Sequence, residues 1–199
     1  GSDTGAMVVE PYLRHRGRRR IDLLVVSHDD LDHAGGAGSV ARLLPVDRRV
    51  ASGRVLDPLG PVERCRRGVQ WTWDGVGFEW LHPGDTLQSK DNDRSCVLLV
   101  RAGPHAVLLT GDIERDAEAE LLEAARVPRV DVLLVPHHGS RTSSTTAFVA
   151  AAWPPWALVP AGHRNRWGFP KPDVVARWQA TGAQVLVGSA TGAIEFELQ

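Results

Sequence analysis

Four short apolar runs, each followed within three residues by histidine or aspartate, constrain the fold of this chain more than any other feature. The runs read LLVV, VLLT, VLLVP and WALVP. Apolar runs of this length with polar boundaries are typical of buried strands. Amphipathic segments separate the later runs. Alternation of strands with helices predicts an α/β fold with mixed sheets and helices on the outside.

The remaining patterns extend this prediction along the chain. Periodicity and capping residues predict helices at 7–16, 37–44, 113–125, 143–153 and 171–180. Alternation around Asp74-Gly75, and two apolar runs joined by AGP, predict hairpins over 69–83 and 95–112. Further strands are predicted at 21–27 and 130–136 and in the segments WALVPAG, QVLVGS and GAIEFEL. We expect residues 1–6 to be a loop or the remnant of a tag, and residues 7–199 to be one domain.

Composition indicates an ordinary globular chain. The net charge is -1, 43% of the residues are hydrophobic, and no apolar run approaches the roughly 20 residues of a membrane-spanning helix. The two cysteines, Cys65 and Cys96, lack CxxC spacing, and we expect both to be small buried or half-buried residues, with a single bridge between them as the alternative. Arginines crowd at 14–20 and at 64–67. Each group is either solvated surface or a patch that binds nucleic acid.

The residues that follow the apolar runs are of the types that bind divalent metals. The candidates are His28, Asp30, Asp32, His33, Asp112, His137 and His138. Imidazole with carboxylate, and without thiolate, suits Zn, Mn or Fe. These candidates are too many for one tetrahedral ion. They fit two ions bridged by a carboxylate, and Asp112 is the natural bridge because it stands alone after its strand.

Two of these assignments leave alternatives open. Asp112 precedes a predicted helix and could be its N-terminal cap instead. Neighbouring side chains of an extended chain point to opposite faces, so one of His137 and His138 faces the metals while the other orients it or donates a proton. We favour His137 as the ligand and His138 as the proton donor. A purely structural turn at 28–33 is unfavourable, because it gathers three carboxylates without a cation.

On the segments SHDDLDH, LLTGD, VLLVPHHGS and AGHRNRWGFPKPDVVARW, the chain resembles the metallo-β-lactamase superfamily and, within it, the C-terminal domain of the ComEC competence proteins. The superfamily motif HxHxDH reads HDDLDH here, with Asp30 in place of the second histidine. The resemblance implies an αβ/βα sandwich that lacks its first strands here, since family members carry further strands ahead of residue 1. It also implies a divalent-metal nuclease that degrades the DNA strand that is not imported.

By position, the resemblance assigns site residues as well. The implied metal ligands are His28, Asp30, Asp32, His33, Asp112 as the bridge, and His137 at the second ion. Ser140 and Asn165 are implied either as phosphate contacts or as residues that support the metal ligands. Phe169 stands where the family often has a histidine, and His163 is a candidate to replace that histidine.

Together these features predict hydrolysis of phosphodiesters in single-stranded DNA with two divalent ions, Mn²⁺ or Zn²⁺. Asp32 and His138 are the predicted catalytic residues, and Arg166 and Trp167 are expected to contact the substrate. The implied partners are DNA and the transmembrane channel of the same protein, on the outer face of an inner membrane; no small-molecule cofactor is predicted. The alternatives are a hydrolase of the same fold that acts on a thioester, lactone or lactam, and a metal- or DNA-binding module without catalysis.

Overall fold

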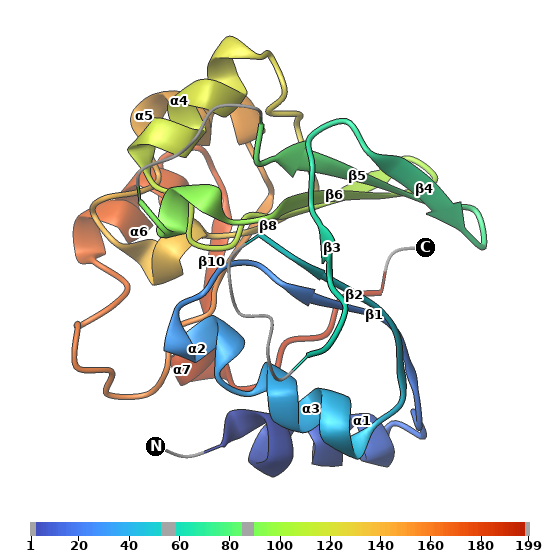
Figure 1. Cartoon of the computed structure of the whole chain (residues 1–199). Coiled ribbons are helices and arrows are strands. Elements are labelled where there is room, and N and C mark those ends of the chain that lie inside the picture. Colours follow the sequence, from blue (N-terminus) through green and yellow to red (C-terminus); the bar gives the residue numbers. More distant parts are fainter. Residues whose placement is uncertain (1–2, 53–58, 85–89, 198–199) are drawn as a thin grey trace.

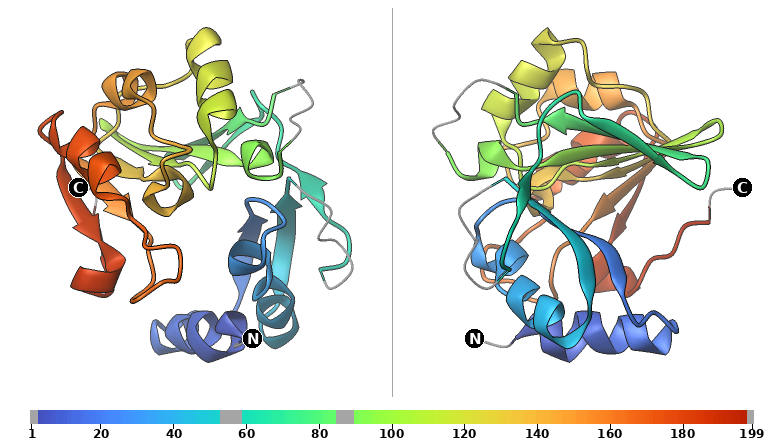
Figure 2. Two further views of the ribbon diagram at one scale, coloured as in Figure 1. Left: turned by 90° about the vertical axis from the view of Figure 1, so that its left-hand side faces the viewer. Right: turned by 45° about the vertical axis from the view of Figure 1, so that its right-hand side comes forward.

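Two facing β-sheets with helices on their outer sides form the architecture (Figure 1, Figure 2). The structure is a computed structural model that describes residues 3–52, 59–84 and 90–197. The smaller sheet contains the parallel strands β1 (Ile21–Val26), β2 (Val46–Ala51) and β3 (Glu63–Arg64), in this order. The arrangement is the predicted αβ/βα sandwich.

The larger sheet has seven strands in the order β10-β9-β8-β7-β6-β5-β4. Antiparallel pairing joins β4 (Gln70–Trp73), β5 (Val76–His82), β6 (Val97–Ala102) and β7 (His105–Leu109). Asp74 and Gly75 both have positive φ and make the two-residue turn that such hairpins favour. Parallel to β7 follow β8 (Val132–Leu134), β9 (Trp156–Val159) and β10 (Gln184–Val187). Both predicted hairpins are confirmed.

Helices cover the outer side of each sheet (Figure 1). The smaller sheet is covered by α1 (Glu10–His15) and α3 (Ala37–Leu43), and the larger sheet by α4 (Arg115–Glu123), α5 (Thr146–Ala152) and α6 (Pro172–Gln179). These five are the predicted helices, with ends that agree to within a few residues. Shorter turns of helix are η1 (Gly5–Val9), α2 (Leu31–Ala34), η2 (Asn92–Arg94), η3 (Pro136–Gly139) and α7 (Gly188–Thr191).

Two local predictions are wrong. Residues 5 and 6, expected in a loop, already belong to η1, and Asp3 Oδ1 accepts a hydrogen bond from Ala6 N at 3.1 Å. Residues 192–197 form no strand, although the alternation in GAIEFEL predicted one; Leu198 lies outside the described residues. A segment with alternating apolar and polar residues forms a strand only where another strand can pair with it. The alternation in GAIEFEL was therefore not enough to predict a strand.

One part of the hydrophobic core lies between the larger sheet and the helices on its outer face, and another part lies between the two sheets. Phe148 of α5 and Trp178 of α6 are fully buried against the outer face of the larger sheet. Between the sheets, Val50 of β2 clusters with Trp80 of β5 and Leu98 of β6. Burial of each large apolar side chain stabilises the fold by about 2–3 kcal/mol. The cluster of Val50, Trp80 and Leu98 therefore holds the two sheets against each other.

A disulfide also joins the two sheets, contrary to the prediction of two separate cysteines. Cys65 directly follows β3 and Cys96 directly precedes β6, with their Cα atoms 5.9 Å apart. Both residues are buried in the cluster between the sheets. The sequence could not reveal this pairing, because it depends on how two separate sheets face each other.

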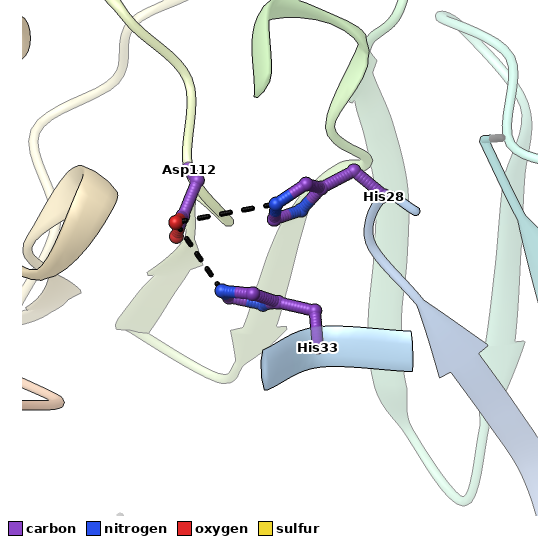
Figure 3. A group of neighbouring side chains, drawn as sticks. All are labelled: His28, His33 and Asp112. Atoms are coloured by element: carbon purple, nitrogen blue, oxygen red, sulfur yellow. Dashed lines mark ion pairs between the residues drawn. The ribbon is translucent and has the colours of Figure 1, made fainter. Parts of the chain in front are cut away.

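The fold brings the four polar strand endings together. The strands β7, β8 and β9 are parallel neighbours, so the segments that follow them leave the same edge of the larger sheet. The segment that follows β1 comes from the smaller sheet and meets them across the sandwich, as His28 and Asp112 do in Figure 3. The predicted ligands thus gather where the ends of the two sheets meet. Among the described residues, no helix has the length and hydrophobicity needed to cross a bilayer.

Candidate metal centre

Three side chains from three different elements form the first of two candidate metal-binding groups (Figure 3). His28 follows β1, His33 lies on α2, and Asp112 follows β7 after a turn at Gly111, whose φ is +57°. Asp112 Oδ2 lies 3.2 Å from His33 Nε2 and 4.0 Å from His28 Nε2. His28 is 0% and Asp112 is 4% exposed, so the group lies inside the molecule.

His33 also belongs to a second group, together with Asp32 and His138. His138 Nε2 lies 3.2 Å from His33 Nε2 and 3.4 Å from Asp32 Oδ2. It also lies 3.2 Å from Asp112 Oδ2, so the Asp112 carboxylate faces three histidines. Two adjoining groups with the Asp112 carboxylate between His33 and His138 suit two divalent ions held side by side.

The three histidines are anchored through Nδ1 and present Nε2 to the centre. His138 Nδ1 donates a hydrogen bond to Pro160 O at 2.8 Å. The hydroxyl of Ser27 lies 3.1 Å from His28 Nδ1 and 3.3 Å from His33 Nδ1. Contacts of this kind fix the tautomer and the ring orientation of histidines that bind metals.

The charges of the centre compensate one another. Burial by itself raises the pKa of Asp112, but hydrogen bonds with His138 and His33 outweigh it and hold the pKa well below its usual range. Burial by itself lowers the pKa of His138, but the hydrogen bond and charge of Asp112 raise it to about 9. Burial, reinforced by His33, lowers the pKa of His28. In the metal-free chain Asp112 is therefore ionised, His138 is protonated and His28 is neutral.

The residues present fit divalent cations. Imidazole and carboxylate donors without thiolate match Zn²⁺, Mn²⁺ or Fe²⁺. His28 Nε2 is buried, and none of the described residues forms a hydrogen bond with it. A buried nitrogen without a partner is unfavourable, and a cation between His28 and Asp112 would satisfy it. Asp30 lies beside this group, with its Oδ2 3.7 Å from His28 Nε2, but it belongs to neither group.

The neighbouring histidines 137 and 138 have different surroundings. Both have left-handed backbones, with φ of 47° and 53°, which cost about 1–3 kcal/mol per non-glycine residue and cluster at functional sites. His138 points to the metal-binding groups. His137 Nδ1 instead lies 3.2 Å from Glu114 Oε1 and 3.1 Å from Thr142 Oγ1. The geometry thus favours His138 as the ligand, the reverse of the assignment from sequence, which wrongly assumed an extended backbone.

A cleft of about 590 Å³ opens beside the centre. It is lined by residues of both metal-binding groups and of the loop 160–169. The ring of Phe169 stacks 6.4 Å from that of His138, and the ring of Trp167 stacks 6.4 Å from that of Phe169, with an angle of 8° between their planes. We call these three side chains the aromatic ladder. It leads from the metal-binding groups to the rim, where Trp167 is 52% exposed.

The other predicted site residues occupy the loops around the cleft. Asn165 lines the cleft, but its amide is used within the loop: Nδ2 donates to Phe169 O at 2.7 Å, and Oδ1 accepts from Phe169 N at 2.8 Å. Arg166 lies on Trp167, its guanidinium carbon 4.2 Å from the ring centroid. Ser140 is buried and is not among the residues that line the cleft. His163 is exposed and does not line it either, so it does not replace a histidine at position 169.

Three residues that support the centre escaped the sequence reasoning. Ser27 anchors two ligand histidines, and Glu114 contacts His137. Ser95 Oγ lies 3.3 Å from His28 Nδ1 and accepts a hydrogen bond from Asp112 N at 3.1 Å. Ser27 directly precedes His28, and Glu114 lies two residues after Asp112. This proximity in sequence to predicted ligands could have indicated a supporting role. Ser95 lies far from them in the sequence and carried no signal.

The arginine-rich segment 14–20 lies away from the centre. It precedes β1, whereas the metal-binding segment follows β1, so the two are at opposite ends of the strand. Several of its arginines are engaged in ion pairs: Arg14 with Glu10, Arg16 with Glu195, and Arg20 with Asp47. This segment therefore does not border the cleft.

Comparison with known proteins shows the family of this chain. Residues 1–163 match the family described as the metallo-beta-lactamase superfamily. The chain is 36% identical over 177 residues to Recombination protein 2 of Haemophilus influenzae. The aligned region covers 89% of this chain and 22% of that protein. It is also 36% identical over 202 residues to Competence protein ComA of Neisseria gonorrhoeae, and this aligned region covers 98% of this chain and 29% of that protein. The chain belongs to the metallo-β-lactamase superfamily, and its resemblance to competence proteins is confirmed.

A solved structure shows the same fold. A metallo hydrolase from the archaeon Ignicoccus hospitalis aligns with a TM-score of 0.59 at 18% identity, over 89% of this chain and 80% of that one. At this identity the likeness shows the fold alone, and it confirms the predicted metallo-β-lactamase fold. The chain spans only about a quarter of the length of the two curated relatives.

Proposed function

We propose that this chain hydrolyses phosphodiester bonds of single-stranded DNA with divalent metal ions during DNA uptake. The observation that carries the proposal is the convergence of three Nε2 atoms and two carboxylates from both sheets. Membership of the metallo-β-lactamase superfamily supports a metal-dependent hydrolase. The similarity to a recombination protein and a competence protein supports DNA as the substrate.

The proposed site is divided between the two groups. Because each imidazole offers a single Nε2 lone pair, His33 would hold only one cation. His28, His33 and Asp112 would hold one, and Asp32 and His138, with the Asp112 carboxylate beside them, would hold the other. Cations such as Mn²⁺ or Zn²⁺ would there acidify a water molecule and neutralise charge on the phosphate. The carboxylate of Asp32 is 53% exposed and lines the cleft, where it can orient the attacking water and accept its proton.

His137 is the proposed proton donor to the leaving oxygen. It lines the cleft, and its Nδ1 lies 3.2 Å from the Glu114 carboxylate and 3.1 Å from Thr142 Oγ1. A carboxylate behind an imidazole stabilises the charged ring and orients it, which leaves Nε2–H for the substrate. His138 held this role in the prediction from sequence, but its Nε2 faces Asp112 and its Nδ1 is bound to Pro160.

The aromatic ladder supports a single-stranded substrate. Trp167 is half exposed at the rim of the cleft, within reach of a base that flanks the scissile phosphate. Stacking of a base on an aromatic side chain is worth about 1–3 kcal/mol, and it requires a base that is not enclosed in a duplex. Arg166 lies on the same ring and supplies positive charge for the adjoining phosphate.

The proposed location is the outer face of the inner membrane, beside the channel of the same protein. Disulfides form and persist in oxidising compartments such as the periplasm, and the buried bridge between Cys65 and Cys96 supports this side of the membrane. The curated relatives are several times longer than this chain, which leaves room for a channel in proteins of that kind.

Cleavage of end-labelled single-stranded DNA tests the proposed function. The chain should cleave the DNA with Mn²⁺, Zn²⁺ or Mg²⁺ and not with EDTA. Asp112→Asn and His33→Ala should abolish cleavage, whereas Arg18→Gln, far from the cleft, should not. Failure of both this chain and a longer form with the upstream segment would overturn the proposal. The thioester, lactone or lactam hydrolase, or the module without catalysis, would then be favoured.

A further inference from the structure

A second cleft, of about 440 Å³, lies beside the metal centre and is rich in arginine. We call it the arginine cleft; its lining includes Arg64, Arg66 and Arg67, with Ser52 and Cys65. Arg67 is paired with Glu120, Nη1 to Oε1 at 3.0 Å. Arg66 is exposed, and none of the described residues forms an ion pair or hydrogen bond with its side chain. Arg66 therefore contributes positive charge that no carboxylate of the described residues neutralises.

The arginine cleft and the metal centre lie at the same edge of the smaller sheet. In the parallel register, Val26 of β1 is paired with Ala51 of β2, which is paired with Arg64 of β3. Neighbouring strands are about 4.8 Å apart, so Arg64 lies roughly 10 Å from the end of β1. His28 follows that end of β1 two residues later. A few nucleotides of a single strand span this distance.

Hydrogen bonds hold the two sites at a fixed separation. Arg64 Nη1 donates to Ser52 O at 2.6 Å, and Ser52 Oγ donates to Ser27 O at 2.5 Å. Ser27 Oγ in turn lies 3.1 Å from His28 Nδ1. The Cys65 disulfide adds a covalent link from the cleft to the larger sheet. Both sites therefore belong to one rigid edge of the molecule.

We propose that the arginine cleft binds a backbone phosphate of the DNA strand whose scissile phosphate lies at the metal centre. This inference rests on the proposed function. Guanidinium groups match phosphate oxygens with two parallel hydrogen bonds, and no residue of the described part of the chain occupies the donors of Arg66. The carboxylates around Asp112 repel DNA before metals bind, and the cleft supplies attraction nearby. The contact between the arginine cleft and the phosphate fixes the position of the DNA strand along the site, at a distance from the bond that is hydrolysed.

Binding of fluorescent oligothymidylate to the metal-free chain in EDTA, followed by anisotropy over a series of salt concentrations, tests this proposal. Loss of one phosphate contact with a single strand lowers the slope of log K against log salt by about 0.7. Arg66→Gln should show this change and bind about fivefold more weakly near about 0.1 M salt. Arg66→Lys keeps the charge and should retain most of the slope. Arg18→Gln removes an exposed arginine at the opposite edge and should bind like wild type.

The outcomes separate this proposal from the proposed function, because binding in EDTA does not depend on hydrolysis. Equal affinity and slope for Arg66→Gln and Arg18→Gln would overturn the arginine cleft and leave the nuclease proposal intact. Failure of the wild-type chain to bind the oligonucleotide would also overturn it. If Arg66→Gln weakened binding to phosphatidylglycerol vesicles but not to the oligonucleotide, the cleft would be assigned to a membrane surface. That result would also overturn the proposal.

Discussion

Reduction of the bridge between Cys65 and Cys96 should destabilise the fold by about 4 kcal/mol. The bridge joins residues 31 apart in sequence, and the loss of loop-closure entropy from an unfolded chain with a loop of this length corresponds to about 4 kcal/mol at 25 °C. Both sulfurs are buried between the sheets, so the thiols stay packed after reduction and the native contacts change little. The effect should therefore come mainly from the unfolded state.

Urea unfolding with and without dithiothreitol measures this difference. At an m value of about 2 kcal/mol per M, a loss of this size lowers the midpoint by roughly 2 M. In the control variant Cys65→Ala/Cys96→Ala, dithiothreitol should leave the midpoint unchanged. Thiol titration of the unreduced chain after unfolding in urea should detect no free thiol. Two reactive thiols in that state, or a midpoint that ignores reduction, would refute a covalent link between the sheets.

Three further substitutions test a buried support of the fold and two residues beside the candidate site. Glu118→Ala should destabilise the fold by about 3 kcal/mol in urea unfolding, because the buried carboxylate accepts hydrogen bonds from Ser144 N and Thr145 N; a loss below about 1 kcal/mol would contradict this. Ser95→Ala should lower metal affinity about 10- to 100-fold by calorimetry, since Ser95 contacts His28 and Asp112 N, and an unchanged affinity would exclude that role. His137→Ala should slow DNA cleavage about 10²- to 10⁴-fold but scarcely affect a p-nitrophenyl phosphodiester, whose leaving group needs no proton. Equal losses on both substrates would make His137 a ligand rather than a proton donor.

Much of the fold could be predicted from the sequence, because local patterns carry it. The Asp74-Gly75 turn, the buried runs that became β1 and β8, and the amphipathic α4 and α6 were all readable from periodicity and capping. The segment GAIEFEL was misread because alternation does not reveal whether a pairing partner exists. The bridge between Cys65 and Cys96 was missed for a related reason, since it depends on the packing of two sheets.

The candidate site was predicted in composition but not in arrangement. His28, His33 and Asp112 were recognisable because metal-binding residue types follow apolar strands. The order of His137 and His138 was not readable, because two successive left-handed residues redirect both side chains. The support by Ser95 was hidden too, because it comes from a segment distant in sequence. Candidate ligands can thus be recognised from local sequence, whereas their orientation follows from the tertiary fold.

Metal binding by the chain tests the central claim most directly. Isothermal titration of the metal-free chain with Zn²⁺ or Mn²⁺ should give two ions per chain. His33→Ala removes a histidine that belongs to both candidate groups and should lower the stoichiometry or the affinity of metal binding. His163→Ala removes an exposed histidine outside the cleft and should bind as wild type does. Full stoichiometry and affinity in His33→Ala would contradict a metal centre built between the two sheets.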